Sequence, residues 1–289
     1  MDEGETETKE GSPFERFKRM APELYEYVKE EGWDPSRELL QIQEVPAHMR
    51  GGLLVNTDWE TSLGHFFAVG EIAGNQAGIA DGSSLNETQV GSSRAAARIA
   101  EVYGEEPGSV ERFIRQIRDA LHQRLEMTEV FQNRVHRAAL SGNRPSLRSL
   151  LRQLGDEMEE NLGLLRCADR LESVMAQASD RLPRILDQYS PSSLSDLSLY
   201  FQIYDLCLCQ LTILSAMADY IRFGGRSRGS FMIYDSEGTK PEASFPDKYR
   251  FRLADAGMNG RLQEITYQEA EGSCQIHWRP IRPIPEEDA

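Results

Sequence analysis

GHFFAVGEIAGNQAGIADGSSLNETQVGSSRAAA, residues Gly64 to Ala97, is the stretch that decides how this chain is interpreted. Its four apolar residues from Phe66 to Val69 predict a short buried strand. Gly70 and Glu71 follow at once, where such a strand would end. A loop that contains three further glycines comes next, so the sequence predicts a strand that runs into a glycine-rich loop.

The glycine-rich loop closes on Ser84-Leu85-Asn86-Glu87, which has the S-x-x-E spacing of a capping box. A helix is therefore predicted from Leu85 to about Tyr103, and Gly104 is its natural end. A strand, a glycine loop and a capped helix bring free backbone N–H groups and the positive end of a helix dipole to one point. An anion or an electron-rich carbonyl of a ligand could bind there.

Composition limits the possible functions. The chain has 289 residues, a hydrophobic content of 39% and a net charge of −15. The length suffices for one large or two ordinary domains, and the negative charge argues against nucleic acid and anionic membrane surfaces as partners. The cysteines form no C-x-x-C pair, so no metal site is assigned to Cys167, Cys207, Cys209 and Cys274. Residues 1–13 are acidic without an apolar core, which predicts disorder, no signal peptide and a cytoplasmic protein.

The segment before the glycine-rich stretch has three predicted parts. Apolar residues recur with helical spacing from Phe14 to Glu31, which predicts an amphipathic helix. A strand is predicted from Leu39 to Val45. Gly51 and Gly52 follow, and two adjacent glycines are typical of a tight turn or of a close approach between backbone and ligand.

Residues 109–224 have helical periodicity almost throughout, which predicts a bundle. The last helix, from about Leu194 to Ile221, is apolar on nearly all sides. Polar residues interrupt it, so it is interpreted as the central helix of the bundle rather than a membrane span. Beyond it, alternating apolar residues predict short strands at Tyr249–Leu253, Ile265–Tyr267 and Cys274–Trp278.

The Gly64–Ala97 stretch resembles the flavin-contacting segment of the succinate dehydrogenase/fumarate reductase flavoprotein family, which includes aspartate oxidase and adenylylsulfate reductase. That family reads roughly GLYAAGE, then a glycine loop, then GGNSL-x-E. The counterparts here, at the right separation, are Phe66-Phe67-Ala68-Val69-Gly70-Glu71 and Asp81-Gly82-Ser83-Ser84-Leu85-Asn86-Glu87. The resemblance implies an FAD cofactor that contacts Gly51, Gly52, Gly70, Glu71, Gly82, Ser83, Ser84 and Leu85.

The resemblance also implies two candidate catalytic residues, His48 and Arg50. The family has a segment like HYTMGG, whose end matches Arg50-Gly51-Gly52, and its histidine binds substrate. His48 meets that position with a one-residue gap, and its other interpretation is a structural imidazole in a loop. Arg50 could supply a cation to the substrate or could be a solvated surface arginine.

At three positions an apolar residue replaces a polar residue of the family pattern. The arginine of the family sequence NRLGGNSL, which grips the substrate carboxylate, falls on Ile79 here. The family segment ESRGxHxRxDxP matches the segment from Arg226 to Asp235, where Phe231 replaces the histidine and Ile233 replaces the second arginine. Apolar side chains cannot bind a carboxylate or move a proton, which argues against chemistry on succinate, fumarate or aspartate.

The G-x-G-x-x-G loop with which the family binds the FAD pyrophosphate does not occur in this sequence. The chain is therefore interpreted as the C-terminal half of such a flavoprotein. The predicted fold class is α+β, mainly α: a partial flavin-binding α/β layer, an antiparallel helical bundle and a small C-terminal strand region. The predicted domains are a disordered leader 1–13, a partial FAD-binding domain 14–107, the bundle 108–224 and a strand and loop region 225–289.

Three functional interpretations stay open. The first is one component of a split FAD-dependent oxidoreductase, completed by a second polypeptide that carries G-x-G-x-x-G, to which an iron–sulfur protein could be added as a redox partner. The second is a structural or assembly subunit that has lost the flavin, which the substituted polar positions favour. The third is a fragment of a longer enzyme, against which the acidic leader from Met1 weighs. The retained Gly70-Glu71 turn favours the first, which is the function predicted here.

Overall fold

The computed structural model describes residues 13–38, 51–74, 83–104, 108–138, 144–228, 231–254 and 256–281. The chain divides into two compact units, Met1–Ala47 and His48–Ala289. The domain boundaries predicted after residues 13, 107 and 224 remain predictions. The strand predicted at Leu39–Val45 lies outside the described residues.

The first unit contains two short helices, α1 (Pro13–Met20) and α2 (Pro22–Glu30), where the sequence predicted a single one. Ala21 breaks the helix with a φ of −136°, because the ring of the following Pro22 disfavours helical backbone at the preceding residue. The Tyr25 ring packs edge-on against Phe14 and Phe17 across this break. No residue of α2 is buried.

The second unit begins with an irregular segment, residues 51–74, where the sequence predicted a buried strand. Two isolated antiparallel bridges, Val55↔Thr61 and Glu60↔Phe67, and the 3₁₀ helix η1 (Gly70–Ala73) are its regular features. The prediction of a strand at Phe66–Val69 is wrong, since Phe66 is exposed and only Ala68 of the four is buried. A strand that is buried on both faces needs a paired strand on each side. In the described part of the chain, residues 66–69 form a single bridge, Glu60↔Phe67.

Helix α3 (Ser83–Val102) confirms the helix predicted after the glycine loop, but it begins two residues earlier than expected. Ser84 is therefore the second residue of the helix and not its N-cap, so the capping-box prediction is wrong. α3 packs against η1. The glycine loop itself, residues 75–82, lies outside the described part of the chain.

The helical region is confirmed. Its elements are α4 (Val110–Ala138), α5 (Leu147–Leu162), α6 (Ala168–Arg181), η2 (Leu182–Arg184), α7 (Ile185–Gln188), η3 (Leu194–Asp196) and α8 (Leu197–Arg222). α6 ends at Arg181, two residues before Pro183, because proline lacks the N–H that would continue the helix. Ser146 caps α5 by accepting the N–H of Ser149 at 3.2 Å.

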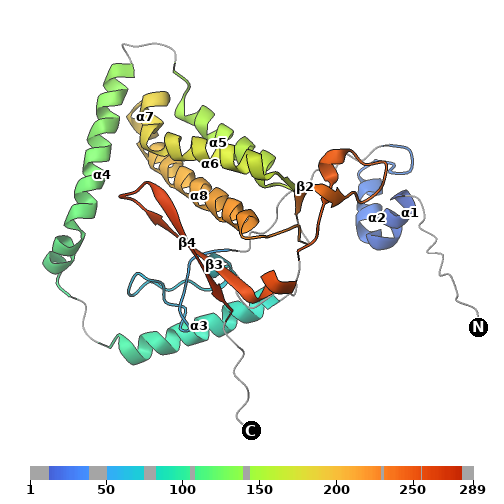
Figure 1. Ribbon diagram of the computed structural model, residues 1–289. Helices are drawn as coiled ribbons and strands as arrows, with labels where there is room; N and C mark the ends of the chain where they lie inside the picture. The colour runs from blue at the N-terminus through green and yellow to red at the C-terminus, as the bar shows by residue number, and fades with distance from the viewer. Residues whose placement is uncertain are drawn as a thin grey trace, which may run out of the picture. The chain divides into compact units, whose positions relative to one another are not determined.

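Helix α8 is the central element of the bundle, because it contacts α5, α6 and both strands of a hairpin (Figure 1). Arg222 at its end pairs with Glu172 near the start of α6, and Gln210 in its middle bonds Arg181 at the end of α6, so α6 and α8 are antiparallel. Glu160 near the end of α5 pairs with Arg170 near the start of α6. The side chains at the contacts form one core around Phe131, Leu150, Leu171, Ile203, Cys207 and Leu214.

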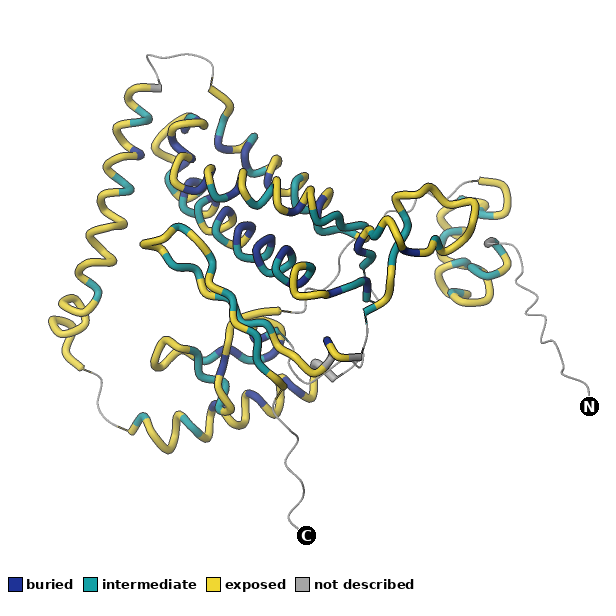
Figure 2. The backbone as a smooth tube through the Cα atoms, in the orientation of Figure 1, coloured by how far each residue is buried: buried dark blue, intermediate teal, exposed yellow. Residues whose placement is uncertain are grey.

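Buried residues gather on α5, α6 and α8, whereas α4 is exposed along most of its length (Figure 2). α4 is held to the core by Phe131, which is fully buried and stacks on Tyr200 with 5.5 Å between ring centroids. Among the described residues, Leu194–Arg222 is long and apolar enough to cross a membrane, a test that core helices of soluble proteins also pass. The contacts of α8 with its neighbours support the interpretation as a bundle helix.

The described residues form two small sheets, one within the C-terminal region and one that joins this region to residues 165–166. β3 (Arg261–Gln268) and β4 (Ser273–Pro280) form an antiparallel hairpin, which confirms two predicted strands. β1 (Leu165–Arg166) pairs in parallel with β2 (Met232–Thr239), and neither was predicted. The strand predicted at Tyr249–Leu253 is wrong: Tyr249 ends a 3₁₀ turn, η4 (Asp247–Tyr249), and Phe251 and Leu253 form only isolated bridges. The overall fold class, α+β and mainly α, is confirmed.

Candidate functional site

Apart from Gly82, which lies outside the described residues, the predicted flavin-contacting residues belong to residues 51–55, η1 and the first half of α3. Leu53 donates its N–H to the carbonyl of Ile72 at 2.7 Å. A Cβ on Gly52 would lie 2.3 Å from that same carbonyl oxygen and 2.5 Å from the backbone nitrogen of Gly74. Packing within the chain therefore requires glycine at position 52. One of the two adjacent glycines is thus explained without any contact to a ligand.

Gly70, the first residue of η1, packs against α3. Its φ of +74° favours glycine, and a Cβ there would lie 2.7 Å from the Thr88 hydroxyl on α3. Because both the backbone conformation and the contact exclude a side chain, Gly70 fixes the distance between the Gly70–Glu71 turn and the first turns of α3. The sequence motif thus has a structural reason that does not depend on a ligand.

The same group leaves a surface on which a cofactor could lie. Gly51 has φ +151° with open space where a Cβ would be, Glu71 is exposed, and the Leu85 side chain is 73% exposed. Further exposed apolar side chains in this segment are Leu53, Leu54, Leu63, Phe66 and Ile72. Exposed backbone and apolar groups fit one wall of a flavin site, whose isoalloxazine ring is largely apolar.

The structure brings together Gly51, Gly52, Gly70, Glu71 and Leu85, with the backbone of Ser83 and Ser84 at the helix start. His48, Arg50 and Gly82 lie outside the described residues, as does Ile79. The binding and catalytic roles predicted for all of these residues stay predictions.

Sequence patterns gave no sign of a polar cluster between residues 58–65 and the end of α3. Glu60 Oε1 accepts hydrogen bonds from the Tyr103 hydroxyl and from the backbone N–H of His65, the latter at 3.1 Å. The imidazole of His65 packs against the Tyr103 ring, with 4.0 Å between ring centroids and an interplanar angle of 43°. The hydrogen bond from Tyr103 is the main cause that holds the pKa of Glu60 below its ordinary value, and the bond from the His65 backbone adds to it. The same bond to Glu60 raises the pKa of Tyr103. The signal was missed because Tyr103 is far from the other two residues in sequence.

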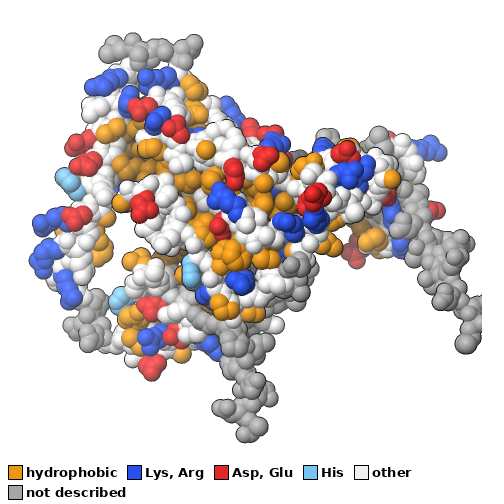
Figure 3. Space-filling model, viewed as in Figure 1, with side chains coloured by type: hydrophobic (Ala, Val, Ile, Leu, Met, Phe, Trp, Pro, Cys, Tyr) orange, Lys and Arg blue, Asp and Glu red, His pale blue; other side chains and the backbone are white. Residues whose placement is uncertain are grey.

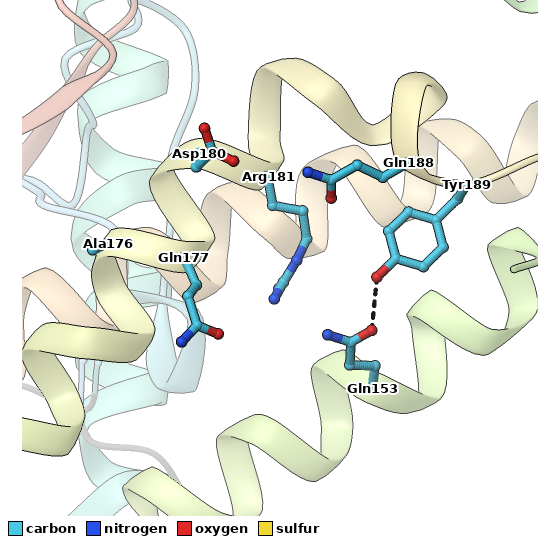
Figure 4. Close-up of a pocket in the computed structure, with 7 residues that line it drawn as sticks. All are labelled: Gln153, Ala176, Gln177, Asp180, Arg181, Gln188 and Tyr189. Atoms are coloured by element: carbon cyan, nitrogen blue, oxygen red, sulfur yellow. Dashed lines mark hydrogen bonds between the residues drawn. The ribbon is translucent and has the colours of Figure 1, made fainter. Parts of the chain in front are cut away.

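An open polar cleft of about 440 Å³ lies on the bundle (Figure 4). Its lining comes from Gln153, Ala176, Gln177, Asp180, Arg181, Gln188 and Tyr189. Arg181 is 4% exposed and binds both carboxylate oxygens of Glu157, at 2.7 and 2.9 Å, and the Gln210 amide at 3.0 Å. The Tyr189 hydroxyl donates to Gln153 at 2.7 Å. These groups bond one another, which is typical of a structural network holding three helices together.

The region that matches ESRGxHxRxDxP is apolar at the two substituted positions. Ile233 is 3% exposed and packs with Tyr220 and Met258. The ring of Phe231 lies under the Arg166 guanidinium, 4.0 Å from its centroid. Arg166 donates to the carbonyls of Leu162 and Gly163 at the end of α5, and burial lowers its pKa to about 10.

Arg166 thus satisfies two carbonyl groups at the C-terminus of α5 that lack a partner within the helix. The substituted positions Phe231 and Ile233 serve packing, and neither side chain can donate or accept a proton.

Short stretches of the chain are similar in sequence to curated proteins, although no family model matches it. L-aspartate oxidase of Pyrococcus furiosus is 32% identical over 75 residues, 26% of this chain and 16% of that protein. L-aspartate oxidase of Pyrococcus abyssi is 34% identical over 61 residues, 21% of this chain and 13% of that protein.

Solved structures match over nearly the whole chain. A point mutant of the quinol fumarate reductase protein FrdA of E. coli has a TM-score of 0.59 at 19% identity, covering 94% of this chain and 43% of FrdA. A quinol-fumarate reductase with menaquinol molecules has a TM-score of 0.60 at 17% identity, covering 95% and 44%. The chain therefore spans less than half the length of the proteins whose fold it shares. The comparisons confirm the resemblance indicated by the motifs: the chain is consistent with a part of the succinate dehydrogenase/fumarate reductase flavoprotein family.

Proposed function

We propose that this chain is one component of a split FAD-dependent oxidoreductase of the fumarate reductase type. It supplies one wall of the flavin site and the helical domain. A second polypeptide with a G-x-G-x-x-G loop supplies the site for the FAD pyrophosphate, and this chain acts in the cytoplasm. The observation that carries the proposal is the fold match, which covers 94% of this chain but 43% of FrdA.

The wall is formed by the group around Gly51, Gly70, Glu71 and Leu85. In the proposal, the backbone N–H groups at the start of α3 face the flavin ring, where donors stabilise the anionic reduced form. FAD supplies the hydride and electron chemistry when it is bound. This chain's own residues position the ring and exclude water from one of its sides.

Exposed apolar side chains support a partner at this wall. Leu53, Leu54, Leu63, Phe66, Ile72 and Leu85 are all exposed. Hydrophobic side chains are also visible between charged ones on the face of the molecule shown in Figure 3. Apolar groups gathered on one segment mark an interface. An iron–sulfur protein that passes electrons would be a further partner of the assembled enzyme.

The test is purification of the chain with its native neighbours, followed by a visible spectrum. Flavin bands at about 450 nm in the complex would support the proposal. The control is the chain expressed alone with added FAD and analysed by size-exclusion chromatography, which is expected to retain no stoichiometric flavin. A flavin-loaded monomer would contradict the split site, and flavin in a longer form of the same polypeptide would identify the chain as a piece of that protein.

One observation favours a second candidate, a structural or assembly subunit without flavin. Phe231 and Ile233, which stand where the family has proton-transferring or substrate-binding groups, are both absorbed by packing. In that case the native complex would form and would carry no flavin bound to this chain.

A further inference from the structure

We propose that residues 56–67, here called the clamp loop, fix the position of α3 and hence of the flavin wall, with Trp59 as the positioning residue. The inference rests on the proposed function for its flavin consequence. Its structural basis is a set of three contacts made by the clamp loop, two with α3 at Gly91 and Arg98 and one with Tyr103, the residue that follows α3.

The first contact is the closest. A Cβ on Gly91 would lie 2.7 Å from Nε1 and 2.8 Å from Cε2 of the Trp59 indole, and 2.9 Å from a Val69 methyl. The indole therefore occupies the space that any other residue at position 91 would need. Arg94, one turn along the helix, lies over the same ring at 5.8 Å from its centroid.

Trp59 is held in this place at an energetic cost. Its φ of +62° lies in the left-handed region, which non-glycine residues rarely adopt. Its indole N–H is buried and has no hydrogen-bond partner among the described residues. Asn56 imposes the turn: its side-chain oxygen accepts the N–H groups of Asp58 at 2.9 Å and Glu60 at 3.1 Å. Backbone strain of this kind persists where the surrounding structure enforces it.

The other two contacts lie further along the chain, at Arg98 on α3 and at Tyr103 just after it. Asp58 is 3.8 Å from the Arg98 guanidinium, and Glu60 accepts the hydroxyl of Tyr103. The three contacts run from Gly91 to Tyr103, beyond the last residue of α3. Because a helix is a rigid rod, contacts at separate points along it fix its rotation and its position along its own axis.

The position of α3 decides the geometry of the wall. Thr88 on α3 contacts Gly70, and Ser83 to Leu85 begin the same helix. A displacement at Gly91 therefore moves the N–H groups at the helix start relative to the Gly70–Glu71 turn. The clamp loop thus sets the distance between the two parts of the sequence motif.

The experiment compares Gly91→Ala with Ser93→Ala in the assembled flavoprotein. Both substitutions place alanine in the same helix, but Ser93 is exposed and Gly91 is covered by Trp59. We expect FAD binding to weaken by about tenfold or more in G91A, an order typical of a misplaced binding group, and to stay within about twofold in S93A. FAD binding in G91A equal to that in S93A would overturn the proposal.

A double-mutant cycle identifies Trp59 as the cause. Leucine lacks the indole atoms that meet position 91, so G91A is expected to weaken FAD binding less in a Trp59→Leu background than in the native one. An equal loss in both backgrounds would show that Trp59 does not transmit the effect.

The clamp can be tested even if the native complex carries no flavin and the proposed function fails. Thermal unfolding of the chain then replaces flavin binding in the same cycle. Alanine has a higher helix propensity than glycine, so propensity alone predicts a higher Tm for G91A. A lower Tm in G91A would therefore reveal the clash with Trp59. A Tm that rises or stays unchanged in G91A would refute the clamp.

Discussion

Cys207 on α8 is fully buried in the bundle core, and burial raises the pKa of its thiol to about 11. In the unfolded chain the thiol ionises near its ordinary pKa of about 9, whereas the folded chain keeps the proton. The stabilising contribution is therefore complete below about pH 9 and is lost as the pH rises toward 11. We expect the free energy of unfolding to fall by about 1 kcal/mol between pH 8 and pH 10 because of this one group.

The measurement is denaturant unfolding of the native chain and of Cys207→Ala across this pH range. The alanine variant loses some packing at every pH but should show a shallower decline, since buried tyrosines then contribute alone. Cys209→Ala is the matched control, because Cys209 is exposed two residues away on the same helix. Identical slopes for the native chain and C207A would contradict the prediction.

Glu157 is a second residue whose pKa makes stability depend on pH. Burial raises its pKa, but hydrogen bonds from Arg181, Gln153 and Gln210 outweigh burial and leave the pKa below its ordinary value. The stability it contributes is present above about pH 4.5 and is lost as the pH falls through the folded-state pKa. Glu157→Gln leaves the buried Arg181 guanidinium without a carboxylate and should cost about 3 kcal/mol at pH 7.

The control for this prediction is Glu160→Gln. Glu160 pairs with Arg170 on the exposed surface, so its loss should cost less than about 0.5 kcal/mol. Urea unfolding at pH 7 and at pH 3.5 checks both values. A cost of E157Q that does not shrink toward pH 3.5 would show that the carboxylate charge is not the stabilising feature.

At the scale of the element, α5 depends on its N-terminal cap. Ser146 accepts the N–H of Ser149, which would otherwise lack a partner at the helix start. Ser146→Ala should lower the free energy of unfolding by about 1 kcal/mol, whereas Ser146→Gly should cost only a few tenths. Denaturant unfolding of both variants measures the difference, and equal losses would rule out the side-chain cap as the cause.

At the scale of the whole molecule, Leu85 tests the proposed interface. Its side chain is 73% exposed on the first turn of α3, where an aspartate is electrostatically favourable. Leu85→Asp should therefore leave the stability of the isolated chain within about 0.5 kcal/mol and weaken association with the partner polypeptide about tenfold or more.

Leu253→Asp is the matched control, since Leu253 is 72% exposed and lies away from the wall residues in sequence and in contacts. Titration of the partner followed by analytical ultracentrifugation measures both affinities. Equal binding by the two variants would place the partner elsewhere on the chain.

The sequence by itself determined the helices and the C-terminal hairpin. α3 and α8 begin and end close to the predicted residues, because their hydrogen bonds and their apolar stripes join residues three and four positions apart. The hairpin of β3 and β4 was also readable, since its two strands alternate and are joined by a short turn. The family motifs around Gly70 and Leu85 indicated the fold that the comparisons confirm.

Only the tertiary structure decided the conformation of Phe66–Val69 and the contacts that require glycine at positions 70 and 91. An apolar run becomes a strand only where another strand pairs with it, and that partner is not specified by local periodicity. The clamp between Trp59 and Gly91 and the network of Glu157, Arg181 and Gln210 join residues 24 or more positions apart. Such contacts form when distant segments pack together, so no spacing rule along the chain reveals them.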